Sequence, residues 1–201
     1  TKSWPMKNTE QYTNLKPMQA DVDIFKDDYA IYNYVDGRLN VREGTAKSDI
    51  LVVPYSVGGF VINSFNPEKL PEEIAEVYLG QNIATIGDSD NMNLKTKNSG
   101  RNLHAMHVAE ENPALMSHEG IIYRKNGDNP QICYIPAKMT QINMLPMETV
   151  EKNTIANHKS VKVIYFPEGT KKLEAYAIEK CSLLEQVYLT KVYIATDRTN
   201  H

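Results

Sequence analysis

The chain has little of what membrane proteins, disulfide-rich domains and nucleic-acid-binding proteins need. No apolar run in its 201 residues approaches the roughly 18 residues of a membrane span, and its two cysteines, Cys133 and Cys181, are too few for a disulfide framework. Lysine and arginine number 22 against 25 acidic residues, and no basic patch is present. The composition therefore argues against a membrane span, a disulfide scaffold and a nucleic-acid partner.

Sequence motifs of catalytic or cofactor sites are also missing. There is no glycine-rich phosphate loop, nucleophile elbow or paired metal-ligand motif. Ser, His and Glu are adjacent at 117–119, but adjacency does not give the geometry of a catalytic triad. His104, His107 and Glu110 follow each other at intervals of three, which on a strand places neighbours on opposite faces. We therefore expect no enzymatic activity, no metal site and no cofactor.

Phenylalanine and tryptophan are scarce, with four and one residues, whereas tyrosine is abundant, with twelve. A tyrosine ring can pack against a sheet while its hydroxyl remains in water. The chain is 41% hydrophobic and 23% charged, which is typical of a folded soluble protein, and its length suits one domain. We expect one folded domain that contains a sheet with one hydrated face.

The N-terminal part of the sequence predicts an irregular lead-in over residues 1–26 and a single domain over 27–201. The first residues, TKSWPMKNTEQ, have neither an initiator methionine nor a signal-peptide pattern, which is compatible with a processed, secreted chain. Two alternating apolar runs then flank Asp36-Gly37, a dipeptide that favours a tight hairpin turn. A second extended unit turns at Gly58-Gly59, so residues 27–70 are interpreted as a hairpin cap and a first unit.

A six-residue pattern, apolar at its first, fourth and sixth positions, occurs four times. Its copies begin at Ile74, Leu103, Val161 and Leu184, the last two 23 residues apart. Three further pairs match at the same offset: Val150 with Leu173, Ile155 with Ile178 and His158 with Cys181. A unit of about 20 to 29 residues cannot bury its apolar side alone, but stacked units form a continuous core. The repeat predicts a leucine-rich repeat solenoid, mainly β, with a parallel sheet.

Three segments do not follow this pattern simply. Residues 170–189 are rich in helix formers, so we expect short helical turns near 174–181 before the last strand. The region 109–160 reads as irregular, with an inserted hairpin at 120–136 that projects from the stack or widens it. Residues 87–101 are polar and rich in turn formers, which predicts a surface loop.

Four stretches also follow the pattern of a known repeat family. They are DILVVPYSVGGFVINSF, NLHAMHVAEENPALMSHEGIIYRKNGDNPQICYIPA, IYFPEG and AIEKCSLLEQVYL, the last with Ile178 where phenylalanine is usual. Over residues 29–190 the chain resembles the BspA-type leucine-rich repeats of bacterial cell-surface proteins. The resemblance implies a curved solenoid with a concave parallel sheet, and a secreted or surface-anchored protein with a role in adhesion or ligand binding. It brings no catalytic residues.

The candidate binding residues lie between the two inward apolar residues of each predicted strand, on the concave side. They are Tyr78, His107, Tyr165 and Tyr188, with Glu76 and Gln186 at neighbouring outward positions. Stacked in sequence order, the rings would form one column able to bind a ligand by stacking and hydroxyl hydrogen bonds. Tyrosine also suits a half-exposed strand, so a purely structural column is the alternative.

We expect a partner that is a protein or a ligand on a host surface. A carbohydrate-binding module is the second hypothesis, because ordered tyrosine faces also suit sugars. A third is an architectural spacer that binds no ligand and tolerates substitutions on its concave face.

Overall fold

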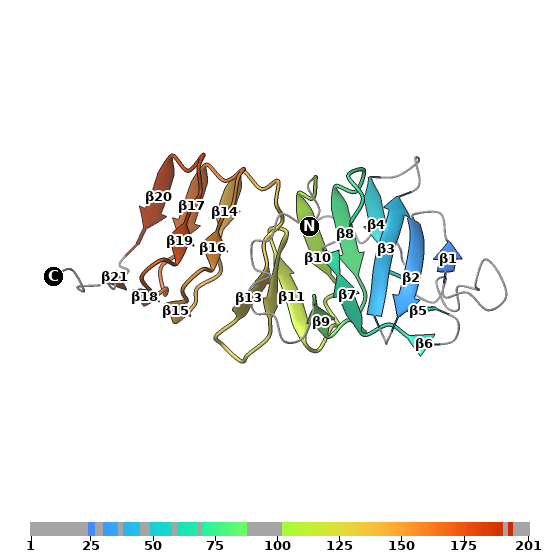
Figure 1. The fold of residues 1–201 in the computed structure, drawn as a ribbon. Coiled ribbons are helices and arrows are strands. Elements are labelled where there is room, and N and C mark those ends of the chain that lie inside the picture. Colours follow the sequence, from blue (N-terminus) through green and yellow to red (C-terminus); the bar gives the residue numbers. More distant parts are fainter. Residues whose placement is uncertain are drawn as a thin grey trace.

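The protein is an elongated stack of strand coils that runs from β1 at one end to β20 and β21 at the other (Figure 1). The computed structural model describes residues 24–26, 30–35, 38–44, 49–57, 60–67, 70–87, 102–190 and 193–194. Four predicted features lie outside these residues: the lead-in up to residue 23, the turns at Asp36-Gly37 and Gly58-Gly59, and the loop from 88 to 101. Within the described part, no helix is long and apolar enough to cross a membrane.

The C-terminal half is built from two coils of three short strands each and the two described strands of a third. The strands are β14 (Gln141–Asn143), β15 (Thr149–Val150), β16 (Ile155–Ala156), β17 (Val163–Phe166), β18 (Lys172–Leu173), β19 (Ile178–Glu179), β20 (Gln186–Leu189) and β21 (Tyr193–Ile194). They form three parallel sheets, in the orders β14-β17-β20, β15-β18-β21 and β16-β19. Val150 lies opposite Leu173 and Ile155 opposite Ile178, so the predicted register is confirmed.

The N-terminal half contains another parallel sheet, in the order β10-β8-β4. It is made by β4 (Ile50–Val52), β8 (Glu76–Leu79) and β10 (Ala105–Val108). Val77 lies opposite Met106 and Leu79 opposite Val108, as the repeat predicts. We refer to β4, β8 and β10 as the N-terminal sheet and to β14, β17 and β20 as the C-terminal sheet.

A hairpin extends a further sheet at the N-terminal end. Strands β1 (Ile24–Lys26), β2 (Ala30–Val35) and β3 (Arg38–Gly44) pair antiparallel, and β3 continues in parallel with β7 (Ser64–Asn66) and β9 (Thr85–Ile86). Strands β5 (Ser56–Val57) and β6 (Phe60–Val61) form a small separate pair. The predicted hairpin strands are therefore present, whereas the end of the predicted irregular lead-in is the strand β1.

An antiparallel meander divides the two halves of the stack. It consists of β11 (Leu115–His118), β12 (Ile121–Arg124) and β13 (Gln131–Tyr134), and lies between β10 and β14 (Figure 1). Ile121, Ile122 and Tyr123 are all fully buried, Ile122 in the core of the N-terminal half and the other two in the core of the C-terminal half. The predicted hairpin is present as β12 and β13. It does not project from the stack but forms an internal partition, because β12 is covered on both faces.

The core follows the repeat. Inward side chains at the equivalent positions Val77, Leu79, Met106, Ile164 and Phe166 are at most 2% exposed. Complete burial of a side chain of this size contributes about 1.5–3 kcal/mol of hydrophobic free energy. Two large clusters of such residues, one in each half, therefore hold the coils together.

The helical turns expected near 174–181 are absent, and that prediction is wrong. Residues 175–177 form a turn between β18 and β19, and both strands pair in parallel with the preceding coil. Tyr176 and Lys180 have left-handed backbone, with φ of 62° and 53°, which interrupts a right-handed helix. Asn153 and Asn157, 23 residues earlier, are left-handed too, with φ of 60° and 58°. The coil thus turns its corners at fixed positions of the repeat.

Candidate functional site

The predicted ring column is divided between two sheets. The four predicted strands all form parallel pairs, but the first two belong to the N-terminal sheet and the last two to the C-terminal sheet. Tyr78 lies opposite His107, and Tyr165 lies opposite Tyr188. The partition formed by β11, β12 and β13 separates the two pairs, so the single column that we expected is two columns.

Tyr165 and Tyr188 form a stacked pair on the outward face of the C-terminal sheet. Their ring centroids are 4.6 Å apart and their planes differ by 5°. The side chains remain accessible, at 38% and 45% exposed. On the same strand as Tyr165, the inward side chains of Ile164 and Phe166 are 0% and 2% exposed and fix the strand to the core. We call Tyr165 and Tyr188 the tyrosine pair.

Amide side chains surround the tyrosine pair. Gln186 is exposed, and its Oε1 accepts a hydrogen bond from the Tyr188 hydroxyl at 3.1 Å. On the other side, Asn143 of β14 lies opposite Tyr165. Its Oδ1 accepts from Gln141 Nε2 at 3.0 Å, and its Nδ2 donates to Glu119 Oε2. The outward face therefore combines two tyrosines with three uncharged amides.

Asn143 and Gln141 were missed because their region was interpreted as irregular. Residues 139–144 read M-T-Q-I-N-M, which fits the six-residue pattern if methionine is accepted at its first and last positions. Ile142 and Met144 are indeed buried, at 0% and 3% exposed. The prediction of an irregular segment is therefore wrong over β14, and methionine was the available signal.

Stacking changes what the tyrosine pair can offer to a ligand. Two nearly parallel rings with centroids 4.6 Å apart contact each other, so no ligand group fits between them. Each ring face that turns toward its neighbour is therefore occupied. The edges, the hydroxyls and the remaining outer faces are what a partner can contact, and a ring edge carries positive electrostatic potential that suits oxygen acceptors.

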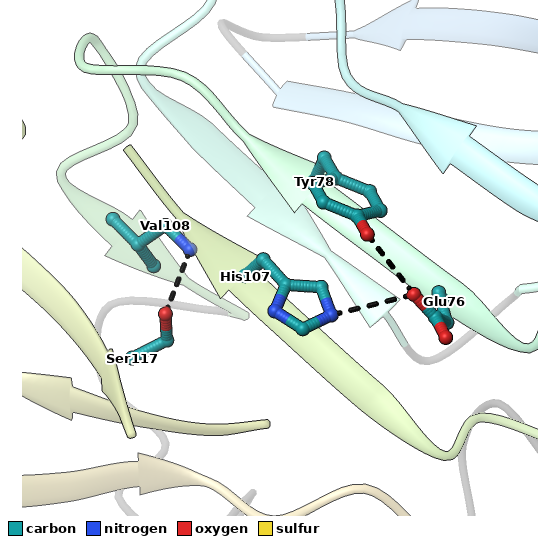
Figure 2. Close-up of polar contacts among 5 residues, drawn as sticks. All are labelled: Glu76, Tyr78, His107, Val108 and Ser117. Carbon is teal, nitrogen blue, oxygen red and sulfur yellow. Dashed lines mark hydrogen bonds and ion pairs between the residues drawn. The ribbon is translucent and has the colours of Figure 1, made fainter. Parts of the chain in front are cut away.

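Glu76, Tyr78 and His107 form a compact cluster on the N-terminal sheet, which we call the Glu76 cluster. Figure 2 shows that the Tyr78 hydroxyl and the His107 ring both point toward Glu76. The hydroxyl donates to Glu76 Oε2 at 3.0 Å, and His107 Nε2 lies 3.4 Å from the same oxygen. The two rings also stack, with centroids 4.6 Å apart and an interplanar angle of 28°.

The Glu76 cluster is less accessible than the tyrosine pair. Tyr78 is only 4% exposed, and the side chains of His107 and Glu76 are 22% and 21% exposed. Burial raises the pKa of Tyr78 to about 12, and the hydrogen bond and negative charge of Glu76 add to this effect. Tyr78 was expected to be an outward-facing ring, but the structure covers it, so the cluster offers a ligand mainly the imidazole and the carboxylate.

The adjacent Ser117, His118 and Glu119 do not act together. The Ser117 hydroxyl accepts a hydrogen bond from the Val108 backbone N–H at 3.0 Å and so ties β11 to β10 (Figure 2). Glu119 instead accepts from Asn143. In the described part of the chain no three His, Cys, Asp or Glu side chains gather as metal ligands, and Cys133 and Cys181 are free thiols.

His158 is a buried histidine, 3% exposed, that closes a corner of the coil. Its Nδ1 accepts from the backbone N–H of Val161 at 3.1 Å and, more weakly, from that of Ser160 at 3.4 Å. Since Nδ1 accepts, Nε2 carries the proton and donates to the Pro136 carbonyl at 3.0 Å. Burial lowers the pKa of His158, partly opposed by this last hydrogen bond. His158 therefore stabilises the fold as a neutral side chain.

No protein-family model matches the sequence, and no curated protein matches it. A comparison with solved structures finds a leucine-rich cell surface protein from Faecalibacterium prausnitzii, with 8% identity and a TM-score of 0.46 over 72% of this chain and 42% of that chain. It also finds the pneumococcal vaccine antigen PcpA, with 12% identity and a TM-score of 0.35 over 84% and 70% of the two chains. A leucine-rich repeat protein from Eubacterium ventriosum has 10% identity and a TM-score of 0.36 over 83% and 72%.

The chain spans 42% of the length of the first of these proteins. Its own strand pairing carries the fold assignment, because apolar residues 23 positions apart lie opposite each other in parallel strands of successive coils. The chain is therefore a β-solenoid of the leucine-rich repeat type, the architecture of the BspA-type family that its sequence resembles.

Proposed function

We propose that the chain is a non-enzymatic, extracytoplasmic repeat module that binds a protein partner through the outward face of the C-terminal sheet. The observation that carries the proposal is the tyrosine pair, which is exposed although its strands are fixed by a buried core. Tyrosine is enriched among the residues that dominate protein interfaces, because it supplies a large contact area with few rotatable bonds. The location is proposed from the family resemblance.

The chemistry of this face suits a polypeptide better than a charged ligand. The outward side chains of Gln141, Asn143 and Gln186 are uncharged amides that can donate to and accept from peptide groups. The tyrosine hydroxyls have the same dual capacity. Glu119 is the one carboxylate that hydrogen-bonds to these amides in the described chain. A partner that presents backbone amides and apolar side chains would satisfy this mixture.

The stacking geometry makes a carbohydrate the weaker alternative. Sugar binding by tyrosine uses an open ring face, and the two faces between Tyr165 and Tyr188 are occupied. A glycan would therefore have only the outer face of either ring. The architectural spacer remains as the hypothesis in which the tyrosine pair has no ligand.

The test is a binding screen with an array of purified extracellular proteins and an array of glycans, probed with the full chain. A hit is then measured with the double variant Tyr165→Ala and Tyr188→Ala, and with Tyr176→Ala as the matched control. Tyr176 is 53% exposed but lies at a corner of the coil, away from the C-terminal sheet.

We expect the chain to bind a protein on the array. The Kd of that complex is expected to rise by about tenfold or more in the double variant and to be unchanged in the Tyr176→Ala control. If the chain instead binds a glycan, and the double variant weakens that binding by a similar factor, the partner is a sugar and not a protein. Silence on both arrays would leave the spacer hypothesis. Equal binding by all variants would mean that the partner is bound outside the tyrosine pair, and would overturn the proposal.

A further inference from the structure

A carboxylate lies beside the tyrosine pair, on the side of the partition. Glu119 belongs to the turn between β11 and β12, and its Oε2 accepts a hydrogen bond from Asn143 Nδ2. Asn143 lies on β14, the strand of the C-terminal sheet nearest to the partition (Figure 1), directly opposite Tyr165 on β17. Neighbouring strands are about 4.8 Å apart. A group that contacts the Tyr165 ring can therefore also reach Glu119.

The turn holds Glu119 in place. Glu119 and Gly120 both have left-handed backbone, with φ of 47° and 84°. Gly120 is buried against β10, where a Cβ would be only 2.8 Å from Ala105 Cβ, and its carbonyl accepts from the Met106 N–H at 2.9 Å. The turn is thus fixed to β10 on one side and to Asn143 on the other. A partner meets a carboxylate that is already positioned, which lowers the entropy cost of binding.

The hydrogen bonds around Asn143 run in one direction. An ionised carboxylate only accepts hydrogen bonds, so Asn143 must turn its Nδ2 toward Glu119. Its Oδ1 then faces Gln141, whose Nε2 donates to it at 3.0 Å. Gln141 Oε1 and Glu119 Oε1 are the oxygens that this row does not use. The row of Gln141, Asn143 and Glu119 therefore presents hydrogen-bond acceptors to a partner.

The charge of Glu119 has no counterion in the described chain. No lysine, arginine or histidine there forms an ion pair with it, whereas Glu148, Glu174 and Glu185 are each paired with a lysine. Glu119 and Gln141 are both exposed to solvent. Complementary charges at an interface favour the correct partner and fix its orientation. The complement of this region is therefore a cation with several N–H donors.

The neighbouring ring distinguishes between the two cationic side chains. The sheet order is β14-β17-β20, so Tyr188 covers the Tyr165 face toward β20, and the opposite face looks toward β14. Asparagine is shorter than tyrosine, so Asn143 can cover only the inner part of that face, and Tyr165 is 38% exposed. A guanidinium is planar, stacks on aromatic rings and carries five N–H donors, whereas an ammonium is a compact and strongly hydrated point charge. Arginine therefore fits better than lysine.

We infer that the protein partner is recognised through one arginine, whose guanidinium lies against the β14-facing side of Tyr165 and donates to Glu119 and Gln141. The inference rests on the proposed function, because it names the side chain that the tyrosine pair and its neighbours select. The rest of the partner segment remains uncharged, in keeping with the amides and hydroxyls of this face.

The first test uses a phage-displayed library of random peptides, selected on the full chain and depleted on the double variant Tyr165→Ala and Tyr188→Ala. The peptides that survive depletion bind through the tyrosine pair, and they are expected to share an arginine at one position. If no peptide survives depletion, both the proposed function and the inference are wrong. Surviving peptides without a shared arginine would overturn the inference alone.

The second test locates the arginine. One selected peptide is synthesised with arginine or with citrulline, which has a similar shape but no charge, at the shared position. Glu119→Gln removes the charge of the protein and keeps an oxygen that accepts from Asn143. Glu110→Gln is the matched control, because Glu110 is exposed and follows the end of β10 that is away from Gly120.

In the wild type and in Glu110→Gln, citrulline is expected to raise the peptide Kd by about fivefold or more, and in Glu119→Gln by less than about twofold. Circular dichroism checks that each variant is folded. An equal effect of citrulline in all three proteins would mean that the guanidinium binds away from Glu119. That result would overturn the inference and leave the proposed function standing.

Discussion

Tyr165 and Tyr188 lie directly opposite each other on neighbouring parallel strands, with ring planes only 5° apart. Each ring covers one face of the other and leaves its hydroxyl edge accessible. The same pair therefore has two separable effects, one on the stability of the sheet and one on what the sheet presents. Measurements of unfolding and of binding can distinguish them.

The first prediction concerns the coupling within the tyrosine pair. Aromatic pairs across strands contribute about 0.2–1 kcal/mol beyond their separate contributions. A double-mutant cycle with Tyr165→Ala and Tyr188→Ala, measured by denaturant unfolding, is expected to give a coupling free energy within this range. Tyr165→Ala with Tyr176→Ala is the control cycle, because the Tyr176 ring contacts the Lys152 ammonium instead, and its effects should add. Additive effects in the first cycle would contradict a stabilising role of the stack.

The second prediction concerns pH and His158. A second proton would occupy Nδ1, which accepts from backbone N–H groups, and would place a charge in a buried site. The folded-state pKa therefore lies below the unfolded value of 6.5. The neutral histidine contributes its full stability above that value. As pH falls below 6.5 the unfolded chain binds a proton that the folded chain resists, so the free energy of unfolding decreases until the lowered pKa is reached.

The measurement compares the wild type with His158→Cys, because Cys181 occupies the equivalent position one coil later and donates to the Ile155 carbonyl. Between pH 7.5 and 5 the wild type is expected to lose more unfolding free energy than the variant, by no more than about 1.4 kcal/mol per pH unit. Carboxylates titrate in both proteins, so their effect cancels in the difference. Identical pH profiles would show that His158 does not control this loss.

The third prediction concerns Gly120, which has φ of 84° and lies against β10. A Cβ there would be 2.8 Å from Ala105 Cβ and 3.0 Å from Ala105 Cα. Gly120→Ala is therefore expected to cost roughly 2–4 kcal/mol, because backbone strain and overpacking add. Gly127→Ala is the matched control: its φ is 54°, but nothing lies within 4 Å of the added Cβ, so it bears only the backbone cost. Equal losses of unfolding free energy in Gly120→Ala and Gly127→Ala, measured by urea unfolding, would show that overpacking against Ala105 does not contribute.

The strand register was predictable because it depends on a local rule. An apolar residue that recurs after 23 positions must meet its counterpart when equal coils stack, and Ile164 does lie opposite Val187. The division into two sheets was not predictable in this way. The sequence of β12 contains adjacent apolar residues, Ile121, Ile122 and Tyr123, but a short apolar run does not show that two different cores cover its two faces.

The candidate site was predictable in its positions but not in its accessibility. Tyr78 and Tyr165 occupy the same position of the repeat, yet one is 4% and the other 38% exposed. The difference lies in the tertiary packing around each ring, and the repeat pattern carries no information about that. The absence of the expected helical turns was also not predictable. Tyr176 and Lys180 have left-handed backbone at the corners of the coil, but tyrosine and lysine are not residues that indicate such a conformation.

The fourth prediction uses the corner positions themselves. Asn157 and Lys180 are equivalent residues of successive coils, and both are left-handed, with φ of 58° and 53°. Asparagine tolerates this backbone better than lysine does, because its short side chain can bond locally. Lys180→Asn is therefore expected to stabilise the chain by about 0.5–1 kcal/mol, less whatever the exposed contact of Lys180 with Glu179 contributes. Asn157→Lys, the reciprocal change, should destabilise it by a similar amount in the same urea titration. Changes of the same sign in both variants would mean that local packing, and not the left-handed backbone, decides which residue suits the corner.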